Sequence, residues 1–277
     1  MANQKRVVGI VIAVLACVAI GLGVYFYIQP AKEAIPVKMP IVKEAPPPPP
    51  EKAIQEEEKK ISPVVLPKLE QSDDLVREKA RDLSSNPKLA DWLNIKNIVR
   101  RIAAAVDSIA EGNSPRVPLN FLNPKKGLTV KKKGERLYVN PKSYTRYNLV
   151  ADIFESLNAE GAVRVFKELK PLFQEAYREL GYPDRDFQDT LIRAIKELLR
   201  TPVVEGDILL EEKAISPSMI SMADEKLEDL SDAQKHLIRM GPKNTAKIQG
   251  KLREIARALG VPENQLPKSR VYFSKVN

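Results

Sequence analysis

Apolar residues recur at close to a 3.6-residue spacing over most of the chain after residue 68, the pattern of helices that bury one face. The spacing predicts helices over 73–83, 144–157, 160–180, 187–199, 225–230, 231–239 and 245–259, with one or two more between 89 and 112. Polar residues ahead of these segments predict Ser72, Asp184, Ser231 and Asn244 as N-caps. Pro171 predicts a kink or a split in its helix.

Short apolar pairs interrupt the helical pattern in the middle of the chain. Leu128 and Val130 precede the basic turn 131–134, and Leu137 and Val139 follow it, which predicts a β hairpin. Similar pairs within 203–210 and 215–222 are expected to add strands to this hairpin. The predicted fold class is therefore mainly α, an α-rich α+β domain with a small β hairpin or sheet.

The N-terminus predicts one transmembrane helix in addition. An uncharged apolar run from Val7 to Ile28 is long enough to cross a bilayer, and it is longer than the apolar part of a cleaved signal peptide. Lys5 and Arg6 precede the run, which predicts a cytoplasmic N-terminus and an uncleaved signal anchor. The expected organisation is a cytoplasmic tail (1–6), an anchor (7–28), a Pro-rich linker (29–68) and a soluble extracytoplasmic domain (69–277).

Two further features of the anchor leave alternatives open. Cys17 follows a sequence that resembles a lipoprotein cleavage box, so lipidation of this residue competes with a plain anchor. Small residues recur every four positions at Gly9, Ala13, Cys17 and Gly21, a pattern that lets two membrane helices approach closely. A homodimer through this face is therefore one hypothesis, and the general richness of membrane helices in Gly and Ala is the other reading.

The linker cannot build a core, because it is rich in proline and includes the run Pro46–Pro50. Such a segment favours an extended polyproline spacer that holds the domain away from the bilayer. A docking peptide for an aromatic groove is the alternative.

Charge and cysteine content exclude several classes of function. The net charge of +9 is spread along the chain, and this modest excess with an extracytoplasmic address disfavours nucleic acid as a partner. The single cysteine is Cys17, so the soluble part is expected to hold no disulfide, no thiolate nucleophile and no Cys-based metal site. We expect no cofactor.

Candidate binding residues gather beside predicted turns. Tyr144, Arg146 and Tyr147 form one group, and Arg239 and Asn244 form another; arginine binds anions through two parallel hydrogen bonds, and tyrosine offers rigid contact area. The alternative is a purely structural role, in which these residues hold the loops against the helices. The hairpin turn adds a basic patch, Lys131, Lys132 and Lys133, which suits anionic surfaces or is simply solvated.

Catalytic signatures are weak in this sequence. His236 is the only histidine, and its position on a predicted helix favours a packed or solvated role over catalysis. The carboxylate pairs Asp152 with Glu155 and Glu205 with Asp207 could serve a glycan hydrolase, but a charged helical protein contains many such pairs by chance. We expect neither catalytic residues nor metal ligands.

Several sequence blocks nevertheless resemble a known family. They include Trp92–Leu93, Ser143–Tyr147, Leu180–Pro183, Leu199–Val203, Ala223–Glu228 and, most strongly, Gln234–Asn244. In this order they resemble the bacterial domain of unknown function 3014. The resemblance implies a Gram-negative envelope protein and brings no activity and no catalytic residues.

The sequence is therefore interpreted as a membrane-anchored envelope protein whose periplasmic domain is a non-enzymatic binding or scaffold module for a protein or cell-wall partner. The alternative is a carboxylate-based hydrolase of cell-wall glycan or peptide, which would need a cleft that holds a carboxyl of raised pKa.

Overall fold

The computed structural model describes residues 66–212 and 220–274. Its α-helices are α2 (Asp73–Ala80), α3 (Lys88–Leu93), α4 (Ile98–Ala110), α5 (Asn148–Glu155), α6 (Ala159–Glu179), α7 (Phe187–Leu199), α8 (Glu225–Glu228), α9 (Asp232–Ile238) and α10 (Pro242–Ala258). Its strands are β1 (Val130–Lys133), β2 (Arg136–Val139), β3 (Val203–Glu205), β4 (Leu209–Glu212), β5 (Ile220–Met222) and β6 (Val271–Phe273). Short 3₁₀ helices include η3 (Asn120–Leu122) and η4 (Pro141–Tyr147). This confirms the α-rich α+β class.

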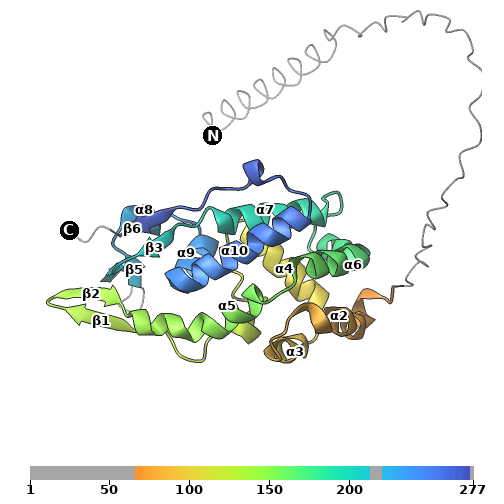
Figure 1. Cartoon of the computed structure of the whole chain (residues 1–277), viewed down its shortest axis with the longest axis horizontal. Coiled ribbons are helices and arrows are strands. Elements are labelled where there is room, and N and C mark those ends of the chain that lie inside the picture. The colour runs from red at the N-terminus through yellow and green to blue at the C-terminus, as the bar shows by residue number, and fades with distance from the viewer. Residues whose placement is uncertain (1–65, 213–219, 275–277) are drawn as a thin grey trace, which may run out of the picture. The chain divides into compact units, whose positions relative to one another are not determined.

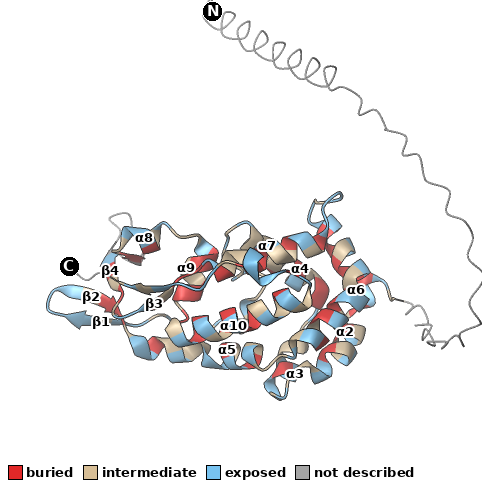
Figure 2. Cartoon of the chain, turned by 45° about the horizontal axis from the view of Figure 1, so that its top comes forward, coloured by how far each residue is buried: buried red, intermediate tan, exposed pale blue. Residues whose placement is uncertain are grey.

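The helices form the body of the fold, and the strands gather at one end of it, with α2 and α3 at the other (Figure 1). One apolar cluster joins α2, α4, α6 and α7, and a second joins α5, α7, α9 and α10. Helix α7 serves both clusters, since Phe187 belongs to the first and Ile195 and Leu199 to the second. Buried residues follow one face of each long helix (Figure 2), as the apolar spacing predicts.

The β end is built on the predicted hairpin. Strands β1 and β2 pair antiparallel around Gly134, whose φ of 59° suits a tight turn. Strand β4 joins β2, and β5 joins β4, which gives the order β1-β2-β4-β5. Strand β3 was also expected in this sheet, and that prediction is wrong: β3 pairs in parallel with β6, a strand that the sequence did not predict.

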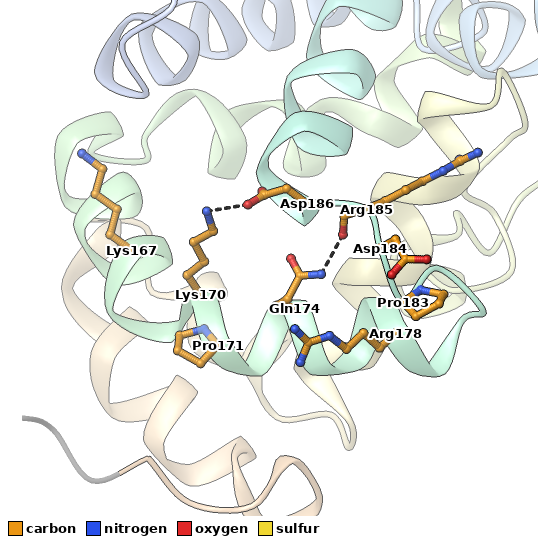
Figure 3. Close-up of a pocket in the computed structure, with 9 residues that line it drawn as sticks. All are labelled: Lys167, Lys170, Pro171, Gln174, Arg178, Pro183, Asp184, Arg185 and Asp186. Carbon is orange, nitrogen blue, oxygen red and sulfur yellow. Dashed lines mark hydrogen bonds and ion pairs between the residues drawn. The ribbon is translucent and has the colours of Figure 1, made fainter. Parts of the chain in front are cut away.

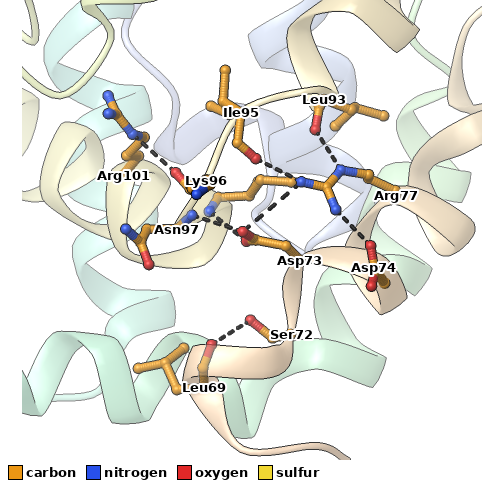
Figure 4. A network of polar contacts seen from close by, with 11 residues as sticks. Leu69, Ser72, Asp73, Asp74, Arg77, Leu93, Ile95, Lys96, Asn97 and Arg101 are labelled. Atoms are coloured by element: carbon orange, nitrogen blue, oxygen red, sulfur yellow. Dashed lines mark hydrogen bonds and ion pairs between the residues drawn. The ribbon is translucent and has the colours of Figure 1, made fainter.

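The start of α4 depends on a residue from another helix (Figure 4). The two carboxylate oxygens of Asp73, in α2, accept hydrogen bonds from the backbone N–H groups of Asn97 and Ile98, each at 2.8 Å. Arg77 then donates to the carbonyl oxygens of Leu93 and Ile95 at 2.9 and 2.7 Å. Together these bonds fasten the chain between α3 and α4 to α2.

Three predicted helix caps are wrong, and one is confirmed. Ser72 has helical dihedral angles and donates to the carbonyl of Leu69 instead of capping α2. Asp186, not Asp184, caps α7, and Asn244 lies inside α10, which begins at Pro242. Ser231 caps α9 in a full capping box with Gln234.

Of the kink or split predicted at Pro171, the split is wrong, because α6 runs unbroken through that residue, and the kink stays a prediction. Proline inside a helix removes one backbone hydrogen bond, which costs stability. The flanking residues Leu169, Leu172 and Phe173 pack into the first apolar cluster, and this packing compensates for the lost bond.

The predicted anchor and the linker up to residue 65 lie outside the described residues. Within 66–212 and 220–274, no helix has both the length and the apolar character needed to cross a membrane.

We expect Asp73→Ala to lower the free energy of unfolding by about 1–2 kcal/mol, because α4 loses the acceptor for its first two N–H groups. Asp74→Ala is the matched control, since its side chain is 96% exposed and bonds only Arg77, and its effect should stay below about 0.5 kcal/mol. Urea denaturation of the two variants measures both values. Equal effects would contradict the capping role.

Candidate functional site

An apolar cavity with polar groups around it lies where α3, α4, α5, α7, α9 and α10 meet the segment 111–123 and η4. Its volume is about 240 Å³, and its lining is mostly apolar. The lining includes Trp92, Leu119, Leu122, Tyr147, Phe154, His236 and Met240. We call this space the α9 cavity. It draws on segments that are far apart in the sequence, so it exists only in the folded chain.

His236 lies in the wall of the α9 cavity and is held neutral. Ser114 Oγ lies 2.9 Å from Nδ1 of the imidazole, and the Tyr147 ring meets the imidazole edge-on at 6.1 Å. Burial, reinforced by nearby arginines, lowers the pKa of His236 to about 4. A neutral imidazole serves as a hydrogen-bonding wall, and its low basicity makes it a poor general base at neutral pH.

Three arginines lie close enough to His236 for their charges to act on it, and we call them the Arg rim: Arg116, Arg146 and Arg239. Arg116 lines the cavity directly, and the Arg146 guanidinium stacks over the Tyr147 ring at 4.9 Å. Arg146 donates to the carbonyl oxygen of Lys126 at 3.3 Å, while its Nε is buried without a hydrogen-bond partner. Among the described residues, no carboxylate forms an ion pair with the Arg rim.

Two of the predicted binding residues instead hold the site together. The amide nitrogen of Asn244 donates to the carbonyl oxygens of Tyr144 and Met240 and to Asn148 Oδ1, at 3.2, 2.9 and 3.1 Å. The Tyr144 ring lies against Gly241, where an added Cβ would come within 2.4 Å of the ring. These contacts fasten η4 to the turn between α9 and α10.

Of the other predicted residues, Tyr147 lines the α9 cavity and Arg146 stacks over the Tyr147 ring. Arg239 directly precedes the lining residue Met240. Sequence reasoning missed Arg116, Ser114 and Trp92 as members of the site. The loop after α4 carries no motif; its one signal is that Leu119 and Leu122 are apolar residues in a segment without helical periodicity.

The predicted basic patch on the hairpin is largely neutralised within the fold. Lys131 and Lys133 both bind the carboxylate of Asp207, and Lys132 lies 3.4 Å from Glu135. Hydrogen bonds from the two lysines lower the pKa of Asp207. This patch therefore offers an external anion less charge than its sequence indicates.

The carboxylate pairs are arranged for structure more than for acid catalysis. Asp152 and Glu155 both bind Lys247 at 2.7 Å, on the outer face of α5 and α10. Burial raises the pKa of Asp107, but this carboxyl faces Tyr177 and lines none of the cavities described. No cluster of ligands suited to a metal ion occurs among residues 66–212 and 220–274.

A larger groove along α6 carries basic side chains (Figure 3), with a volume of about 570 Å³. Lys167, Lys170 and Arg178 face it from α6, but Lys170 is paired with Asp186 at 2.8 Å. Gln174 uses its amide to hold the backbone of Arg185 and Phe187. The groove is open and its polar groups are partly used by the fold, so it is the weaker candidate.

We expect stability to fall in acid through His236. Between the usual pKa of 6.5 and the lowered value of about 4, the unfolded chain binds a proton that the folded chain does not. The free energy of unfolding therefore decreases as pH falls through this window, by roughly 3 kcal/mol in total. Denaturation of His236→Gln at each pH isolates the contribution of His236 to this pH dependence. The variant retains every carboxylate, so its unfolding free energy should fall less between pH 6.5 and pH 4 than that of the unchanged chain. Parallel curves for both proteins would contradict it.

Gly241→Ala should destabilise the chain by roughly 2–4 kcal/mol, because Gly241 has a φ of 88° and its new Cβ would meet Tyr144. Gly250→Ala is the control: it lies in α10 with open space around its Cβ, and it should be neutral or stabilising. Thermal unfolding compares them. A loss at Gly241 no greater than at Gly250 would contradict the close approach.

The family model described as Protein of unknown function (DUF3014) matches residues 98–256, more than half of the chain. The match confirms the resemblance seen in the sequence, and it contains the whole Arg rim and His236. No curated protein and no solved structure matches the chain. The chain belongs to the DUF3014 family.

Proposed function

We propose that this chain is a single-pass protein of the inner membrane whose soluble part acts in the periplasm as a non-enzymatic binding module. The apolar run from Val7 to Ile28 supports the anchor, and Lys5 and Arg6 before it support the orientation. The α9 cavity is the binding site in this proposal. The observation that carries it is an apolar cavity beside three arginines that no carboxylate of the described chain neutralises.

A binding role accounts for the chemistry of the site better than hydrolysis does. The Ser114–His236 contact of 2.9 Å is the feature that favours a hydrolase. A nucleophilic serine needs a base that accepts its proton, and the arginines around His236 oppose the imidazolium that would form. The same arginines favour an anion that is already charged when it arrives.

Location is tested with reporter fusions at the C-terminus. We expect an alkaline phosphatase fusion to be active and membrane-bound, and a green fluorescent protein fusion to be dark, because the C-terminus is proposed to lie outside the cytoplasm. Removal of residues 1–28 should leave the phosphatase inactive. An active phosphatase fusion would exclude a cytosolic location of the domain. A fluorescent green fluorescent protein fusion would instead place the C-terminus in the cytoplasm and contradict the proposed location.

Binding is tested by site-specific photo-cross-linking in cells. A photoreactive residue at Asn123, in the cavity lining, should capture a defined envelope protein, and one at the exposed Glu175 of α6 should not. Arg239→Met should reduce the Asn123 product several-fold. Equal capture at Asn123 and Glu175, or capture at Asn123 that is unchanged in Arg239→Met, would contradict the α9 cavity as the binding site. Release of cell-wall fragments by the purified chain would establish a hydrolase instead, and its loss in Ser114→Ala would assign the activity to the Ser114–His236 pair.

A further inference from the structure

The α9 cavity and the Arg rim together define what the bound group must contain. Building on the proposed binding role, we infer that the site captures the C-terminal residue of a partner protein. The apolar side chain of that residue enters the cavity, and its terminal carboxylate binds the Arg rim.

The volume fits one large side chain. A dry apolar cavity of roughly 150 Å³ accommodates benzene, so about 240 Å³ suits a phenylalanine or leucine side chain with its Cα. Drug-sized ligands and cofactors occupy pockets of roughly 300–1,000 Å³. A terminal alanine would leave most of this space empty. The aromatic walls from Trp92, Tyr147 and Phe154 favour an aromatic or bulky aliphatic group.

The charge fits a carboxylate. Arginine presents a planar fork of N–H donors that matches a carboxylate through two parallel bonds. Elsewhere in the described chain, arginines beside acids are paired, as Arg100 is with Glu70 and Glu179. In the part of the chain that the structure describes, no carboxylate forms an ion pair with the Arg rim.

The connection between the two points to a chain end. In an internal acidic residue the side chain is the carboxylate, so the same residue cannot also place an apolar side chain in the cavity. The last residue of a protein carries an α-carboxylate on the carbon that bears its side chain. Arg116 lines the cavity itself, so one residue can reach both features. Capture of a C-terminal carboxylate is an established mode of peptide recognition.

The experiment uses the full chain in lipid nanodiscs and the fluorescence of Trp92, which is the only tryptophan and lines the cavity. The probe is a short acetylated Gly-Ser peptide that ends in phenylalanine with a free carboxylate. We expect a saturable change in emission. The same peptide with an amidated end, or with a terminal alanine, should bind at least tenfold more weakly.

Variants connect the signal to the Arg rim. Arg146→Met and Arg239→Met should each weaken the free-acid peptide roughly tenfold and leave the amidated peptide unchanged. Arg178→Met is the control, because Arg178 is an exposed arginine of the α6 groove and should not alter binding. Circular dichroism confirms that each variant is folded.

Three results would overturn the inference. The first is an amidated peptide that binds as tightly as the free acid. The second is decanoate that binds more tightly than the peptide, which would indicate a lipid ligand. The third is calorimetry that detects no peptide binding. Cross-linking at Asn123 that survives any of these results would leave the proposed binding module standing, so the two failures are distinguishable. Loss of both would refute the module as well.

Discussion

The contact between the Tyr144 ring and the backbone of Gly241 is the constraint on which the candidate site depends. It joins η4 to the α9–α10 turn at a distance that only a residue without Cβ permits. Gly241 also has a φ of 88° and a ψ of 160°, a backbone region that is essentially restricted to glycine. Asn244 adds three hydrogen bonds at the same place. Because Arg146 and Tyr147 follow Tyr144 directly, this contact sets where they lie relative to His236 and Arg239.

The spacing of apolar residues was enough to predict the helices. Their first residues were predicted wrongly where two neighbouring polar residues could each act as the N-cap. Asp184 and Asp186 flank the same turn, and periodicity cannot decide which carboxylate reaches the first N–H groups of α7. Pro242 was the better guide to the start of α10, since its fixed φ and missing N–H suit the first helical turn. The pairing of β3 with β6 joins Val204 to Tyr272, and no local pattern encodes so distant a partner.

Only those residues of the candidate site that are close together in the sequence could be predicted. Arg146, Tyr147 and Arg239 could be named because cationic and planar groups cluster beside turns in the sequence. Arg116 and Trp92 reach the same cavity from segments with no such clustering, and folding alone brings them there. The basic hairpin shows the opposite error: charges that look available in the sequence are matched in the fold by Asp207, more than seventy residues away.

The placement of acids in the described fold sets the Arg rim apart from other cations. The chain has 36 acidic residues, and the described fold brings them to its cations repeatedly: two acids flank Arg100, two bind Lys247, and Asp207 joins two lysines. The charges of three arginines act on His236, and within residues 66–212 and 220–274 no acid forms an ion pair with them. Repulsion among these cations opposes folding at neutral pH, and the suppressed protonation of His236 adds to the cost only in acid. An arriving anion would relieve that repulsion, which is why the proposed ligand of this cavity carries a negative charge.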